Sequence, residues 1–182
     1  MQGIHIVSAA LVLGLVCLSS APAAAQTLES PVLRLEVAAQ PYGFRLVEKS
    51  TGDVLLAHTR TVLASGNEMA GADVRMTGTT LTAGLHGYGG ATSQVTFTFI
   101  TPEVLRVVVD AGQAPGNVTQ EFDDQGEHYY GVWEYPFGGA IDNRGADFDF
   151  LGLQRHPDVN YSSARAPFYM TSRKYAIYAE TT

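Results

Sequence analysis

The chain has 182 residues, of which 46% are hydrophobic, and a formal net charge of −7 at pH 7. This length suits one domain after removal of a leader and is enough to bury a sizeable core. The acidic balance, with no basic run to neutralise phosphates, argues against nucleic acid as a partner.

The first segment, residues 1–25, is predicted to be a secretory signal peptide. Residues 4–18 form a nearly continuous apolar run, and Ala25 ends an A-x-A cleavage site. The run is shorter than the roughly 20 residues of a bilayer span, so stable membrane insertion is not expected, and a membrane anchor is the alternative. We expect the mature chain, residues 26–182, to be secreted or periplasmic. Removal of the signal would also remove Cys17, the only cysteine, and so exclude a disulfide.

After the leader, apolar residues recur with period two. The stretch "VLRLEV" (32–37) places its Leu and Val residues at 33, 35 and 37 on one face of a strand. "GFRLVE", "DVLLAH", "SQVTFTFI" and "VLRVVVD" alternate in a similar way, and "KSTGD" (49–53) predicts a hairpin loop. No window of twelve residues carries a helical apolar stripe. The pattern therefore predicts an all-β fold, an antiparallel β-sandwich.

The composition changes beyond residue 121. Residues 126–150 combine aromatic rings with carboxylates and include the only tryptophan, Trp133. Gly and Asp are dense between residues 123 and 152, which predicts long irregular loops over a sheet, a usual place for a binding surface. Rings beside carboxylates suit a sugar, whose C–H face stacks on a ring while its hydroxyls donate to oxygens. Strands return near residues 167–180, and the stop directly after an apolar strand predicts a cut end.

Carboxylates are the remaining candidates for chemistry, because the sequence has no nucleophile elbow, no H-E-x-x-H and no P-loop. If residues 146–150 are extended, Asp147 and Asp149 project from the same face, where they could bind sugar hydroxyls or a calcium ion. Calcium needs six to eight oxygens and no EF-type loop is present, so we predict no metal site and no cofactor. His128 is expected at a strand or loop edge rather than as a catalytic base. A solvated acidic loop is the alternative for each carboxylate.

Three segments of the last third resemble a known family. They are "YYGVWE" (129–134), "DNRGADFDF" (142–150) and "YSSARAPFYMTSRKYAIYAE" (161–180). Together they resemble the end of the N-terminal β-sandwich domain of family 31 glycoside hydrolases, which include α-glucosidases and α-xylosidases. Trp133 departs from the pattern, because the family usually has glycine before the glutamate.

The resemblance implies a galactose mutarotase-like supersandwich that packs beside a (β/α)8 barrel. That barrel carries the aspartate nucleophile and the acid/base of a retaining mechanism, and the sandwich contributes one loop to the rim of the sugar pocket. On this reading Asp147, Asp149 and Trp133 contact substrate, and this chain contains no catalytic residue. Its partners would be an α-linked oligosaccharide or glycoside and the barrel of the same enzyme, which would meet an apolar surface of the sandwich.

The resemblance therefore predicts that residues 26–182 are the non-catalytic N-terminal domain of a longer, secreted α-glycosidase. The alternative is a free-standing carbohydrate-binding module that uses the same aromatic and acidic loop. A third reading is a structural envelope protein without a ligand.

Overall fold

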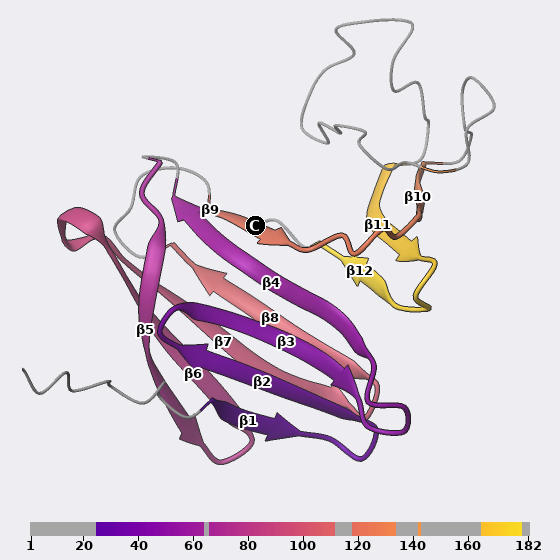
Figure 1. The fold of residues 1–182 in the computed structure, drawn as a ribbon, viewed down its shortest axis with the longest axis horizontal. Helices are drawn as coiled ribbons and strands as arrows, with labels where there is room; N and C mark the ends of the chain where they lie inside the picture. The colour runs from indigo at the N-terminus through magenta and orange to yellow at the C-terminus, as the bar shows by residue number, and fades with distance from the viewer. Residues whose placement is uncertain (1–24, 64–65, 112–117, 134–141, 143–164, 180–182) are drawn as a thin grey trace, which may run out of the picture.

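The computed structural model describes residues 25–63, 66–111, 118–133, 142 and 165–179. These residues are almost entirely in β-strands, and their only helical element is a 3-10 turn, Tyr88–Gly90. In this part of the chain no helix has the length and apolar character needed to span a membrane. All strand pairs are antiparallel, which confirms the predicted all-β antiparallel class (Figure 1).

The first sheet has the strand order β1-β2-β3-β4-β9. Its strands are β1 (Gln26–Glu29), β2 (Leu33–Ala39), β3 (Tyr42–Glu48), β4 (Val54–Leu63) and β9 (Val118–Phe122). The second sheet, in the order β5-β6-β7-β8, consists of β5 (Met69–Thr77), β6 (Thr80–Gly87), β7 (Thr92–Thr101) and β8 (Val104–Asp110). The two sheets lie face to face as a sandwich (Figure 1).

The core lies between these two sheets. Phe44 of the first sheet meets Phe97 of the second edge to face, with ring centroids 4.9 Å apart. Residues of β1 to β7 supply the rest of the buried cluster, mostly at alternate positions, as the two-residue period of a strand requires. The cluster consists of Leu28, Leu35, Val37, Tyr42, Phe44, Leu63, Met69, Leu81, Ala83, Leu85, Val95 and Phe97.

Several sequence predictions agree with this arrangement. Leu33, Leu35 and Val37 are buried on one face of β2. The predicted hairpin is present, because β3 and β4 pair on either side of residues 49–53. The alternation of apolar and polar residues was therefore sufficient to predict these strands of the first sheet.

Two parts of the sheet structure differ from the sequence analysis. β5 and β6 were not anticipated as strands, because Gly, Thr and Ala dilute their apolar signal. Tyr129–Trp133, predicted to lie within irregular loops, forms strand β10 instead. The backbone N–H and C=O groups of β10 find hydrogen-bond partners in a third sheet. In this sheet β10, β11 (Arg165–Thr171) and β12 (Ala176–Tyr178) pair in that order.

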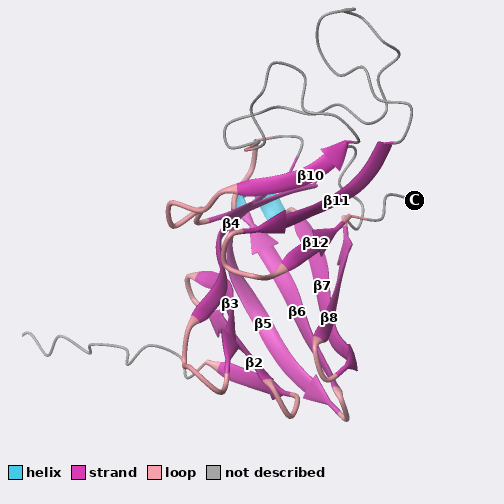
Figure 2. Cartoon of the chain, turned by 90° about the vertical axis from the view of Figure 1, so that its right-hand side faces the viewer, coloured by secondary structure: helices cyan, strands magenta, loops and turns pink. Residues whose placement is uncertain are grey.

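This third sheet lies across one end of the sandwich (Figure 2). Two hydrogen bonds connect β4 to the third sheet and to the loop that precedes β10. The Asp123 amide donates to the Ala57 carbonyl at 2.8 Å, and the Arg173 guanidinium donates to the carbonyl of Val54. These two bonds connect the third sheet to the sandwich.

Candidate functional site

The three-stranded sheet has two faces of different character. Cross-strand pairing places Gly131 opposite Tyr169, and Tyr169 opposite Ile177, on one face. Phe168 pairs with Tyr178 on the other face. Because side chains alternate along a strand, these pairs define an inner face and an outer face.

The inner face contains a buried carboxylate. The Glu127 side chain is only 1% exposed, and neither carboxylate oxygen accepts a hydrogen bond from a described residue. Its nearest cation is Arg173, whose Nε lies 3.9 Å from Oε1. A carboxylate this enclosed cannot reach a sugar in solution, so its contribution is to the structure around it.

Two phenols share this enclosed environment. Burial, with smaller contributions from the neighbouring Tyr129 and Glu127, raises the pKa of Tyr169 to about 12. Burial also raises the pKa of Tyr175, to which the Glu127 carboxylate adds. Both hydroxyls therefore stay protonated at neutral pH and remain hydrogen-bond donors.

An exposed histidine–carboxylate pair lies at the start of β10. The Nδ1 of His128 lies 2.6 Å from Oδ2 of Asp142, whose Oδ1 accepts the Tyr129 amide at 2.9 Å. The His128 amide donates to the Ser172 hydroxyl at 3.1 Å, which connects the pair to the β11–β12 turn. His128 is thus at a strand edge, as predicted. The contact with Asp142 fixes the orientation of the His128 ring.

The outer face is apolar and open. Phe168, Met170 and Tyr178 are 38%, 49% and 63% exposed. Phe168 and Met170 are two residues apart on β11, and Tyr178 is the direct partner of Phe168 on β12. These three side chains, called the outer face below, form a patch of the kind that binds a sugar ring or another domain.

The structure shows only part of the predicted binding segment. Trp133 ends β10, where its backbone pairs with Arg165 at the start of β11. Trp133 and Arg165, the described residues that flank 134–164, are therefore cross-strand partners. Asp147 and Asp149, the carboxylates predicted to contact sugar, lie outside the described residues, and the same is true of most of that segment.

Gly131 has a structural role at this site. Its φ is 105°, and a Cβ there would lie 3.0 Å from the Phe168 carbonyl oxygen. An L-residue would be strained by both the backbone conformation and this contact. The glycine therefore permits the close approach of β10 and β11, beside the irregularity in their pairing between Gly131 and Trp133.

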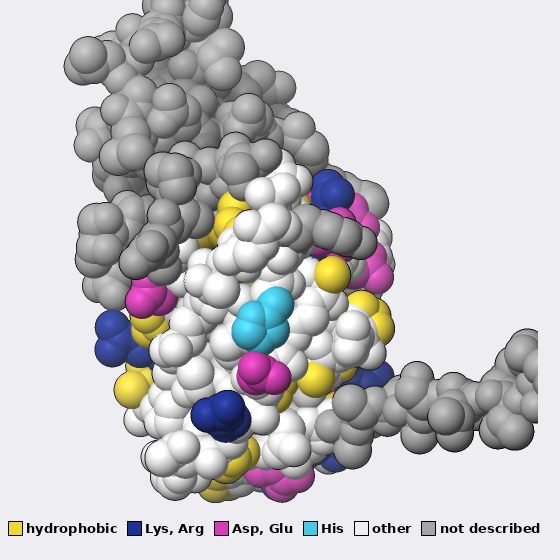
Figure 3. Space-filling view, turned by 90° about the vertical axis from the view of Figure 1, so that its left-hand side faces the viewer, with side chains coloured by type: hydrophobic (Ala, Val, Ile, Leu, Met, Phe, Trp, Pro, Cys, Tyr) yellow, Lys and Arg dark blue, Asp and Glu magenta, His cyan; other side chains and the backbone are white. Residues whose placement is uncertain are grey.

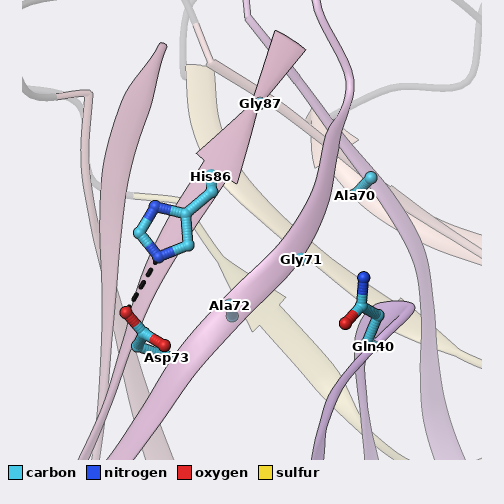
Figure 4. Close-up of a pocket in the computed structure, with 7 residues that line it drawn as sticks. All are labelled: Gln40, Ala70, Gly71, Ala72, Asp73, His86 and Gly87. Atoms are coloured by element: carbon cyan, nitrogen blue, oxygen red, sulfur yellow. Dashed lines mark hydrogen bonds and ion pairs between the residues drawn. The ribbon is translucent and has the colours of Figure 1, made fainter. Parts of the chain in front are cut away.

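A second polar location lies on β5 and β6. A depression of about 340 Å³ is lined by Gln40, Ala70, Gly71, Ala72, Asp73, His86 and Gly87 (Figure 4). The Nε2 of His86 lies 3.0 Å from Oδ2 of Asp73, and both side chains are more than half exposed. Figure 3 shows a histidine beside a carboxylate on this face, among mostly uncharged atoms. No Phe, Tyr or Trp side chain is among the residues that line the depression, so it lacks the stacking surface that the third sheet provides.

Metal binding receives no support from the part of the chain that the structure describes, in which no three His, Cys, Asp or Glu residues come together as ligands. Comparison with known proteins adds no further constraint. No protein-family model, no curated protein and no solved structure matches this chain. The family 31 resemblance therefore stays a prediction.

Sequence analysis missed the burial of Glu127 and the pairing of His128 with Asp142. The first had a local signal, because Glu127, Tyr129 and Gly131 are two residues apart and so share a face of an extended chain. The second had none, because residues 128 and 142 are brought together by tertiary structure.

Proposed function

We propose that this chain is a non-catalytic β-sandwich domain of a secreted α-glycosidase similar to family 31 enzymes. In this role it would dock on a (β/α)8 barrel and help to shape the sugar pocket of that barrel. The barrel would hydrolyse α-glycosidic bonds with retention, and the sandwich would correspond to the galactose mutarotase-like domain of such enzymes.

The outer face of the third sheet is the observation that supports this proposal most. A solvent-exposed group of two aromatic rings and a methionine is costly to leave uncovered unless a ligand or another domain covers it. Phe168, Met170 and Tyr178 belong to the segment that carries the most specific part of the family resemblance. A docked barrel would remove this apolar area from water.

The residues that flank the binding segment also support the proposal. Trp133 and Arg165 are cross-strand partners in the same sheet as the outer face. A loop held there would lie at the border between the sandwich and a docked barrel. We propose that Asp147 or Asp149 accepts a hydrogen bond from a sugar hydroxyl at that border, and that Trp133 contacts the same sugar.

A titration of the isolated chain tests the proposal. Trp133 is the only tryptophan, so its fluorescence reports on the proposed sugar-contact region. Without a barrel we expect no hydrolysis of aryl α-glucosides or α-xylosides and no saturable change below about 1 mM oligosaccharide. Hydrolysis by the chain alone would contradict the proposal.

The second candidate is a free-standing carbohydrate-binding module, which the same exposed rings favour. It predicts saturable binding of an α-linked oligosaccharide at micromolar concentrations. Replacement of both Phe168 and Tyr178 by alanine would then weaken binding about tenfold or more, because ring stacking is lost. Ile100→Ala is a matched control, since Ile100 is 61% exposed but lies on β7.

A further inference from the structure

Strand β8 forms an edge of the second sheet. It pairs with β7 along one side, and no described strand pairs with its other side. Such an edge presents main-chain N–H and C=O groups that can extend the sheet with another strand. β8 contains neither proline nor lysine, the residues that most often protect an edge from pairing.

The side chains of β8 leave apolar surface at this edge. Leu105 and Val109 pack against the core, whereas Val107, on the same face, is 38% exposed. On the opposite face, Val108 is 45% exposed between Arg106 and Asp110. An additional strand would cover Val107 and continue both faces of the sheet.

We propose that β8 pairs antiparallel with β8 of a second copy of this chain, with Val108 opposite Val108 about a two-fold axis. In this register Val107 lies opposite Val109 of the other copy, and Leu105 lies opposite Ala111. The paired segment spans residues 105–111. Regular pairing of β8 with β7 also begins at Leu105, which lies opposite Phe99. Before it, the register of the two strands shifts between Phe99 and Thr101.

Charge selects this partner and this register. Arg106 and Asp110 lie two residues on either side of Val108, on the same face as Val108. When Val108 faces its own copy, Arg106 of each chain lies directly opposite Asp110 of the other. A symmetric dimer therefore contains this oppositely charged cross-strand pair twice. Moving the two-fold axis by one residue would remove both pairs, and moving it to Arg106 or Asp110 would place like charges opposite each other.

The backbone at the end of β8 is held in place for such pairing. The Ser93 hydroxyl donates to the Asp110 carbonyl at 2.6 Å, and Asp110 pairs with Gln94 of β7. A preformed, extended edge loses little conformational entropy when it binds another strand. This inference does not depend on the proposed function, because β8 belongs to the second sheet and the outer face to the third.

Sedimentation analysis of the chain, purified from a secreting host, tests the proposal over a wide range of concentration. We expect a reversible monomer–dimer equilibrium. Arg106→Asp would place aspartates opposite each other twice and should raise the dimer dissociation constant about tenfold or more. The double variant Arg106→Asp with Asp110→Arg exchanges the charges, so it should restore dimerisation to near the level of the unchanged chain.

Val108→Lys provides a second test, because it places two ammonium groups opposite each other at the axis and should leave a monomer. Ile100→Asp, on the neighbouring strand but outside the paired segment, should leave the equilibrium unchanged. A chain that is monomeric at several hundred micromolar would overturn the proposal. A dimer that persists in Val108→Lys, or that the charge exchange fails to restore, would also overturn it.

Discussion

Replacement of Phe97 by alanine is expected to lower the free energy of unfolding by about 3–5 kcal/mol. Phe97 has no solvent exposure, and it contacts Phe44 across the interface between the two sheets. The substitution removes a ring from the middle of a closely packed core, and the two sheets cannot close the resulting cavity without breaking their pairing. Domains of this size have about 5–15 kcal/mol of stability in total, so the loss is large.

Urea denaturation followed by circular dichroism measures this change. Ile100→Ala is the matched control, because it also shortens an apolar side chain of β7, but one that is 61% exposed. We expect the control to change the free energy of unfolding by no more than about 0.5 kcal/mol. Similar losses for the two variants would show that the core does not lie between the sheets as described.

Acidification from pH 6.5 to pH 4 is expected to destabilise the fold through His58. Burial lowers the pKa of His58 from 6.5 to about 4, and the ring stacks on Phe44 at a centroid distance of 4.6 Å. Its Nε2 lies 3.0 Å from the Thr61 hydroxyl, whereas its Nδ1 has no hydrogen-bond partner among the described residues. The folded state therefore holds the neutral ring.

The direction of the effect follows from proton binding. Between pH 6.5 and 4 the unfolded chain binds a proton at His58 and the folded chain does not, so acid favours unfolding. A lowering of the pKa from 6.5 to about 4 corresponds to about 3 kcal/mol, present above pH 6.5 and fully lost near pH 4. Exposed ion pairs lose their contribution to stability at lower pH, because their carboxylates take up protons there. An example is Glu121, whose pKa is lowered below 4.5 by a hydrogen bond from Arg60.

Urea denaturation at a series of pH values, with His58→Gln as control, isolates this contribution. The glutamine amide does not titrate, so this variant keeps the losses due to carboxylates and lacks the loss due to the histidine. We expect the unchanged chain to lose about 3 kcal/mol more than the variant between pH 6.5 and 4. Equal slopes for the two proteins would contradict the burial of a neutral His58.

Local periodicity explains which parts of the fold were predictable from sequence. Leu33, Leu35 and Val37 alternate with charged residues, so both the strand and its buried face could be read directly. β6 carried the same signal more weakly, because Leu81, Ala83 and Leu85 are buried but alternate with Thr and Gly rather than with charged residues. Its apolar face was therefore overlooked.

Features that depend on tertiary contacts were not predictable. The burial of His58 depends on strands that lie far apart in the sequence, as does the pairing of His128 with Asp142. The same limit applies to β8, since a sequence pattern shows a strand but not its place at the edge of a sheet. The proposed contact of Trp133 with sugar stays a prediction.

The size of the native protein tests the central claim most directly. An antibody raised against this chain should be used on extracts and medium of the source cells, together with an in-gel assay for α-glucosidase and α-xylosidase. The account predicts an antigen longer than this 19.5 kDa chain by at least a barrel of about 250 residues, and α-glycosidase activity that migrates with it. An antigen no larger than 19.5 kDa, with no activity at its position, would contradict the account.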